Sequence, residues 1–77
     1  MHHDDMLDAT GLTCPMPLLK MKLQLKALSP DQILHVIATD SGSWKDFHKF
    51  AEITNNELLK AEEVDGQYQY WIKKGTQ

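Results

Sequence analysis

The sequence predicts a two-layer α/β (α+β) sandwich in which two helices cover one face of a four-stranded mixed sheet. The length allows one small domain over residues 1–77. Strand-like and helix-like segments follow in the order βαβαββ, and the last two strands flank Asp65-Gly66, a strong hairpin turn. Because crossovers between parallel strands are right-handed, both helices are expected on the same face of the sheet.

The first strand and the first helix follow a charged start. Residues 1–5 are interpreted as a polar, disordered tail, and Met6–Thr10 as a short extended segment. Pro15–Leu28 fits both the alternation of a strand and the stripe of a helix. The run is rich in leucine, lysine and methionine and has no β-branched residue, which favours a helix that ends before Pro30.

The middle of the chain predicts a buried strand and a second helix. Ile33–Thr39 is rich in apolar and β-branched residues, as buried strands are. After the loop Asp40–Gly42, Ser43 is expected to cap a helix, with Asp46 three residues later at capping-box spacing. Aromatic residues recur on one face of this helix and are interpreted as core, and Asn55 marks its end.

The last third of the chain predicts two strands, Glu57–Val64 and Gln67–Lys73, joined by the Asp65-Gly66 turn. Side chains of a strand point alternately to its two faces. One face of the last strand therefore carries Tyr68, Tyr70 and Ile72, and the other carries Gln67, Gln69, Trp71 and Lys73.

Composition narrows the function classes. The net charge is −3 and the chain has no arginine, which argues against a nucleic-acid partner. One cysteine cannot form an internal disulfide, so a disulfide-stapled secreted scaffold is excluded. No signal pattern and no apolar run of membrane length is present in the sequence. We therefore expect a cytoplasmic protein without a membrane partner.

The only cysteine stands in the segment Thr13-Cys14-Pro15-Met16-Pro17. If Cys14 is the N-cap of the first helix, Pro15 occupies N1 and Pro17 occupies N3, where no intrahelical donor is needed. The helix dipole and free N–H groups of the first turn, that of Met16 among them, would then stabilise a thiolate. Cys14 is thus predicted to have a lowered pKa and to act as a nucleophile, with Thr13 and the three residues after it in support. The alternative is a small cysteine that merely packs.

Other candidate groups carry weaker signals. His35 and His48 are interpreted as structural, and a Cys–His pair requires a fold that brings one of them to Cys14. Asp40 is either a loop acid or the acceptor of a turn hydrogen bond. His3 could chelate copper or nickel with the amino terminus, an arrangement given little functional weight. No metal site is predicted, because zinc needs further ligands at metal spacing, and no cofactor is expected.

Three segments together resemble the TusA/SirA-like sulfur carrier family. They are the opening Leu7–Pro17 with its Cys-Pro-x-Pro element, the strand Leu34–Asp40 and the hairpin Glu63–Gly75. The resemblance covers roughly residues 7–75. It implies the same βαβαββ sandwich, similar to the C-terminal domain of translation initiation factor three. It further implies a sulfurtransferase in which Cys14 accepts sulfane sulfur as a persulfide and passes it on.

In members of this family the donor is a pyridoxal-phosphate cysteine desulfurase or another sulfane-sulfur donor. The acceptor is a further sulfur-relay protein, in the best-known members one that serves tRNA thiolation. Many members of the tRNA pathway carry a basic residue where this chain has Thr13. Two alternatives stay open: a selenium- or redox-related thiol protein, and a non-catalytic binding or regulatory module that uses a surface such as Gln67, Gln69 and Trp71.

Overall fold

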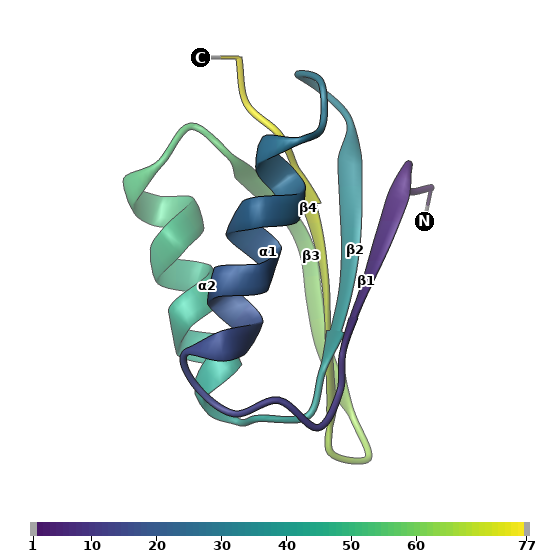
Figure 1. The fold of residues 1–77 in the computed structure, drawn as a ribbon, viewed down its shortest axis with the longest axis vertical. Coiled ribbons are helices and arrows are strands. Elements are labelled where there is room, and N and C mark those ends of the chain that lie inside the picture. The colour runs from purple at the N-terminus through teal and green to yellow at the C-terminus, as the bar shows by residue number, and fades with distance from the viewer. Residues whose placement is uncertain (1, 77) are drawn as a thin grey trace.

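The computed structural model describes residues 2–76 and has the predicted element order (Figure 1). Its strands and helices are β1 (Asp5–Ala9), α1 (Met16–Lys26), β2 (Ile33–Ala38), α2 (Gly42–Ile53), β3 (Glu57–Val64) and β4 (Gln67–Lys73). The predicted type of every element is confirmed. The helical interpretation of the leucine- and lysine-rich run is also correct, since Met21 and Leu25 of α1 lie in the core.

The four strands form one mixed sheet in the order β1-β2-β4-β3. β1 and β2 are parallel, whereas β4 lies antiparallel between β2 and β3. Both helices cover the same face of this sheet, which gives the predicted two-layer sandwich (Figure 1). Within residues 2–76 the opposite face of the sheet is not covered by a helix.

The core lies between the helices and the sheet. Phe47 of α2 stacks on Tyr70 of β4 with 4.2 Å between ring centroids. The Tyr70 hydroxyl is hydrogen-bonded to the Ser43 hydroxyl at 2.7 Å, and burial raises the pKa of Tyr70 to about 12. The remaining core is apolar: Ala9, Met21, Leu25, Leu34, Val36, Ala38 and Ile72.

The hairpin between β3 and β4 has the predicted turn. Asp65 and Gly66 adopt positive φ angles of 53° and 83°, as a two-residue turn between right-twisted strands requires. Tyr68, Tyr70 and Ile72 share one face of β4 as predicted, and this face packs on the core, whereas Trp71 lies on the opposite face.

Two local predictions are wrong. Asp5 already begins β1, and the Asp4 N–H donates to the Ile33 carbonyl at 2.8 Å, so this part of the expected tail belongs to the sheet. Met1 of that tail lies outside the described residues. The second helix begins at Gly42, and Ser43 does not cap it, because its hydroxyl is buried against Tyr70. Burial of the tyrosine hydroxyl, which needs a partner, overrides the local capping pattern.

Candidate functional site

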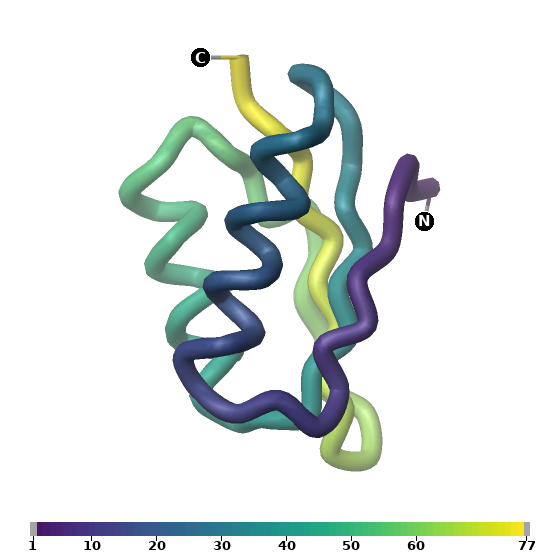
Figure 2. Tube along the Cα trace, viewed as in Figure 1, coloured from purple at the N-terminus to yellow at the C-terminus, as the bar shows by residue number. Residues whose placement is uncertain are grey.

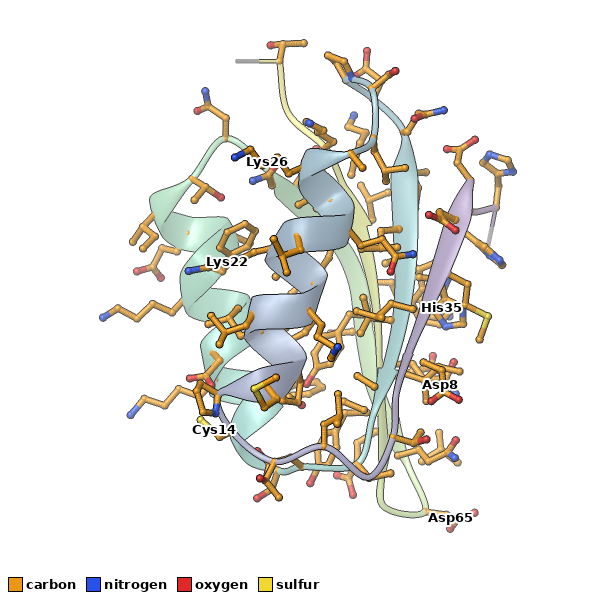
Figure 3. All side chains as sticks on the ribbon, viewed as in Figure 1. Asp8, Cys14, Lys22, Lys26, His35 and Asp65 are labelled. Atoms are coloured by element: carbon orange, nitrogen blue, oxygen red, sulfur yellow. The ribbon has the colours of Figure 1, made fainter. Side chains whose placement is uncertain are left out.

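The loops that lead into the two helices meet at one end of the molecule (Figure 2). Gly11, with φ of 80°, turns the chain after β1, and its N–H donates to the Thr39 hydroxyl at 2.9 Å. This bond ties the loop before α1 to the end of β2. The exposed Cys14 thiol lies on this loop, at the foot of the helical layer (Figure 3).

The start of α1 differs from the predicted one. Pro15 is the N-cap and α1 begins at Met16, so Cys14 stands one residue before the cap. The peptide bond between Cys14 and Pro15 is cis. The Met16 N–H donates to the Thr13 carbonyl at 2.8 Å, and Pro17 is buried in the first turn without an N–H of its own. The expected stabilisation of a thiolate by this N–H group is therefore absent.

The hydrogen-bond partner of Cys14 is a carboxylate on α2. Its Sγ donates a hydrogen bond to Oδ2 of Asp46, in the second turn of α2, at 3.3 Å. This hydrogen bond raises the pKa of the Cys14 thiol above its ordinary value, and desolvation and the negative charges of Asp46 and Asp40 raise it further. The prediction of a lowered pKa is wrong, because two carboxylates, and not a helix start, dominate the surroundings of the sulfur.

The sequence allowed two roles for Asp40, a loop acid or the acceptor of a turn hydrogen bond, and the structure shows the turn hydrogen bond. Its Oδ2 accepts the Gly42 N–H at 3.1 Å, and its backbone carbonyl accepts the Ser43 N–H at 3.1 Å. A side chain at position 42 would place its Cβ 2.9 Å from this Oδ2 and 3.7 Å from Cys14 Cβ. Gly42 therefore lets the entry of α2 approach the thiol closely.

The histidines are not partners of the thiol. His35 stacks on Trp71 on the sheet face that carries no helix, with ring centroids 4.4 Å apart, whereas Cys14 lies at the helical layer (Figure 3). His48 Nδ1 contacts the Trp44 carbonyl at 2.7 Å. Within residues 2–76, the side chain that Cys14 contacts by a hydrogen bond is Asp46, and neither His35 nor His48 pairs with the thiol.

Trp71 is expected to be part of the alternative binding surface with Gln67 and Gln69, but its ring is buried. It is 7% exposed, stacked on His35 and covered by the Lys60 ammonium, 5.2 Å from its ring centroid. An interaction surface around Gln67 and Gln69 would have little of this ring available.

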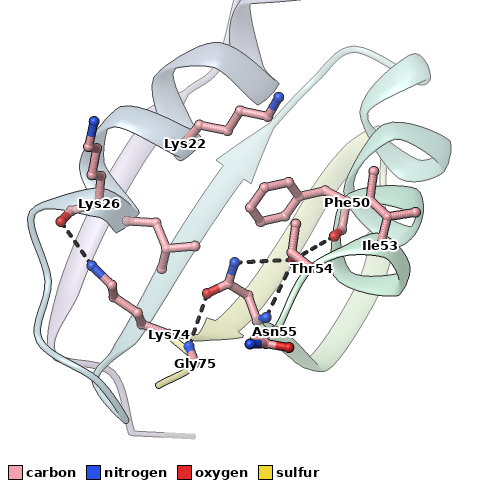
Figure 4. Close-up of a pocket in the computed structure, with 10 residues that line it drawn as sticks. Lys22, Lys26, Phe50, Ile53, Thr54, Asn55, Lys74 and Gly75 are labelled. Carbon is pink, nitrogen blue, oxygen red and sulfur yellow. Dashed lines mark hydrogen bonds between the residues drawn. The ribbon is translucent and has the colours of Figure 1, made fainter. Parts of the chain in front are cut away.

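A groove lies at the opposite end of the helices from Cys14. It has a volume of about 770 Å³ and runs between the C-terminal ends of α1 and α2 and the end of β4 (Figure 4). Lys22, Lys26 and Lys74 line it together with Phe50 and Ile53, and none of its lining residues is acidic. The Lys74 ammonium donates to the Lys26 carbonyl at 2.9 Å. The groove is basic and open, and it does not contain the thiol.

Within residues 2–76, no helix is long and apolar enough to cross a membrane. In the same range, no three histidine, cysteine, aspartate or glutamate side chains are grouped so that they could hold a metal ion.

Sequence reasoning found Cys14 but missed Asp46 as its partner. The spacing of Asp46 from Ser43 marked it only as a capping residue. No local pattern connects it with a cysteine 32 residues earlier, since the contact arises from the packing of α1 beside α2.

Comparison with known proteins identifies the family. The family model described as sulfurtransferase TusA matches residues 5–74. A sulfur carrier protein TusA of Allochromatium vinosum is 54% identical over 71 residues, which cover 92% of this chain and 93% of that protein. A sulfur carrier protein TusA of Pseudomonas aeruginosa is 42% identical over 71 residues, covering 92% and 90%. The fold matches the crystal structure of a SirA-like protein from Desulfitobacterium hafniense with a TM-score of 0.80 at 24% identity, over 95% of this chain and 100% of that one. The chain therefore belongs to the TusA/SirA-like sulfur carrier family.

Proposed function

We propose that the protein is a sulfur carrier that takes up sulfane sulfur as a persulfide on Cys14 and hands it to an acceptor protein. The observation that carries the proposal is the exposed Cys14 thiol, the only thiol of the chain, on a loop at one end of a TusA-family fold. A carrier has to meet two protein partners in turn, and both can reach a sulfur in this position.

The chemistry is two successive exchanges at sulfur. The Cys14 thiolate attacks the terminal sulfur of a donor persulfide, a new S–S bond forms, and the donor leaves as a thiolate. An acceptor thiolate then attacks the terminal sulfur on Cys14, and Cys14 leaves as a thiolate. One sulfur atom moves in each step, no external oxidant or reductant is needed, and no bound cofactor takes part.

Asp46 gives the thiol a proton acceptor at 3.3 Å. In the resting protein the hydrogen bond holds Cys14 protonated, which limits its reaction with oxidants and adventitious electrophiles. During loading the proton passes to the carboxylate as the sulfur attacks. The same carboxylate can return the proton when Cys14 leaves in the second step.

The outer face of α1 supplies a docking surface next to the thiol. Met16, Leu19 and Leu23 are 40%, 44% and 72% exposed, at the i, i+3 and i+7 positions of one helix face. We call these three residues the α1 apolar stripe. It begins two residues after Cys14, so a partner that covers the stripe is brought to the sulfur. The partners are a cysteine desulfurase or other sulfane-sulfur donor and a downstream acceptor protein.

Intact-mass measurement tests the proposal. The protein is incubated with cysteine, pyridoxal phosphate and a cysteine desulfurase, with and without reductant. We expect a reductant-sensitive gain of about one sulfur atom, lost in Cys14→Ser. A gain that persists in Cys14→Ser would contradict the proposal.

If the desulfurase gives no gain, thiosulfate with a rhodanese, or a polysulfide, replaces the donor. Loading by one of these reagents would assign a different donor to the same carrier chemistry. Failure with all three would favour the binding module.

A further inference from the structure

A second cluster of chemically active side chains lies on the sheet face that carries no helix. His35 of β2 is 9% exposed and stands opposite Met6 of β1 in the parallel register. The His3 ring lies against the His35 ring, with 5.1 Å between centroids. This cluster of His3, Met6 and His35 is unrelated to the thiol, which lies at the helical layer (Figure 3).

His35 holds an unused electron pair inside this cluster. Its Nε2 is 3.0 Å from Oε1 of Gln69, and because an amide oxygen only accepts, Nε2 carries the ring proton. In the neutral imidazole, Nδ1 then bears the lone pair. It is the one buried side-chain nitrogen or oxygen within residues 2–76 that has no hydrogen-bond partner. Such an atom costs free energy unless a water or an ion satisfies it.

The arrangement around His35 is that of a metal ligand. Metal-binding histidines usually donate their second ring N–H to a carbonyl or carboxylate, which fixes the ring and leaves the other nitrogen for the metal. The Gln69 amide provides this contact. Trp71, stacked on His35 at an interplanar angle of 9°, further fixes the orientation of the ring.

The ligand atoms near His35 determine which metal ion the cluster prefers. Same-face side chains on adjacent strands are about 4.8 Å apart, so the Met6 thioether can reach a metal on His35. The carboxylates two residues before and two residues after Met6 already have hydrogen-bond partners: Asp4 accepts from the Ile33 N–H and contacts His2, and Asp8 accepts from the Thr10 N–H and hydroxyl. A neutral set of two imidazoles and a thioether suits a soft monovalent ion better than Zn²⁺ or Mg²⁺.

We propose that His3, Met6 and His35 bind one Cu(I) ion on the open sheet face. His3 and Met6 are exposed side chains that can rotate to admit the ion, whereas His35 is the fixed ligand. The site is separate from the sulfur-transfer proposal and stands on different residues.

Anaerobic titration of Cu(I) into Cys14→Ser protein tests the site, with bathocuproine disulfonate as the competing chelator. The Cys14→Ser background removes the thiol, which would itself bind Cu(I). We expect one tightly held Cu(I) per chain and a change in Trp71 fluorescence, because this ring stacks on His35. No retained Cu(I) would overturn the proposal.

Single variants in the same background assign the ligands. Met6→Leu removes a surface ligand and should weaken Cu(I) binding about tenfold or more, and Gln69→Leu should weaken it by about 10- to 100-fold through His35. His48→Asn, the matched histidine control on α2, should bind as tightly as the parent. Unchanged affinity in both Met6→Leu and Gln69→Leu would overturn the proposal. So would loss of binding in His3→Ala with full affinity in Met6→Leu, which would place copper at the amino terminus.

Discussion

The Cys14 thiol donates its hydrogen bond to Asp46, so the sulfur on the loop before α1 and its hydrogen-bond acceptor on α2 come from different elements. The contact requires the loop before α1 and the second turn of α2 to lie side by side. A carboxylate in this position favours the thiol over the thiolate, in contrast to a helix N-terminus, which has the opposite effect. The free thiol of Cys14 should therefore be less reactive than the predicted N-cap position would make it.

Replacement of Asp46 by asparagine should activate the free thiol. The Asp46→Asn variant removes the nearest negative charge, so the pKa of Cys14 falls and more thiolate is present at neutral pH. We expect alkylation by iodoacetamide at pH 7 to accelerate severalfold. Glu52→Gln, a neutralised carboxylate in the last turns of the same helix, is the control and should react as the parent does. An unchanged alkylation rate in Asp46→Asn would show that the carboxylate does not hold the proton.

The pH dependence of Cys14 follows from the same contact. Because the pKa of the folded thiol is raised, its alkylation rate should still be climbing at the pH where an ordinary cysteine has reached its plateau. The rate is measured by iodoacetamide from pH 6 to 11 beside a short peptide that contains one cysteine. A plateau in the protein at or below that of the peptide would contradict the raised pKa.

Tyr70 makes the fold sensitive to high pH. Its pKa is about 12 in the folded protein, against an ordinary value of 10.0. The unfolded chain thus loses the tyrosine proton first, and the free energy of unfolding should fall as pH rises from 10 towards 12. Urea unfolding at several pH values measures this, and Tyr70→Phe should remove part of the decline.

Ser43 is expected to stabilise the core and not the helix start. Ser43→Ala leaves the Tyr70 hydroxyl buried without its 2.7 Å partner and should cost about 1–3 kcal/mol of unfolding free energy. In Ser43→Ala/Tyr70→Phe the polar pair is gone, so the double variant should be more stable than the sum of the two single losses predicts. Additive losses by urea denaturation would favour a capping role for Ser43.

The α1 apolar stripe should affect sulfur uptake from protein donors but not from small-molecule donors. Leu23→Glu places a charge on it and should slow sulfur uptake from a desulfurase by about tenfold or more, as loss of a central interface contact does. Loading by polysulfide should be unchanged, because this small donor needs no docking surface. Ile53→Glu is the matched control: Ile53 is 69% exposed and lies at the far end of α2, while Leu23 is 72% exposed. Equal rates in the two variants would remove the stripe from the docking surface.

Much of this architecture is predictable from local patterns. The β-branched run Ile33–Ala38 and the Asp65-Gly66 turn follow from backbone preferences that tertiary contacts do not alter. The leucine- and lysine-rich run has two competing periodicities, and helix propensity decides between them correctly.

The errors share one physical cause. Ser43 and Asp46 have the spacing of a capping box, yet each makes a tertiary contact instead, Ser43 with Tyr70 and Asp46 with Cys14. A helix that starts one residue later than expected also fits Cys-Pro-x-Pro, since proline is tolerated throughout the first turn. A local pattern gives the residue types available at a helix start, whereas the packing of neighbouring elements decides which partners they find.

The position of β4 has a consequence for synthesis of the protein on the ribosome. β4 is the last strand along the chain, yet it pairs with both β2 and β3, so β3 has no neighbour in the sheet until β4 has emerged. α2, the helix that carries Asp46, packs its Phe47 on Tyr70 of that same strand. A nascent chain that stops before β4 lacks the surface on which α2 rests. The contact between Cys14 and Asp46 therefore depends on a strand that is synthesised more than 50 residues after the thiol.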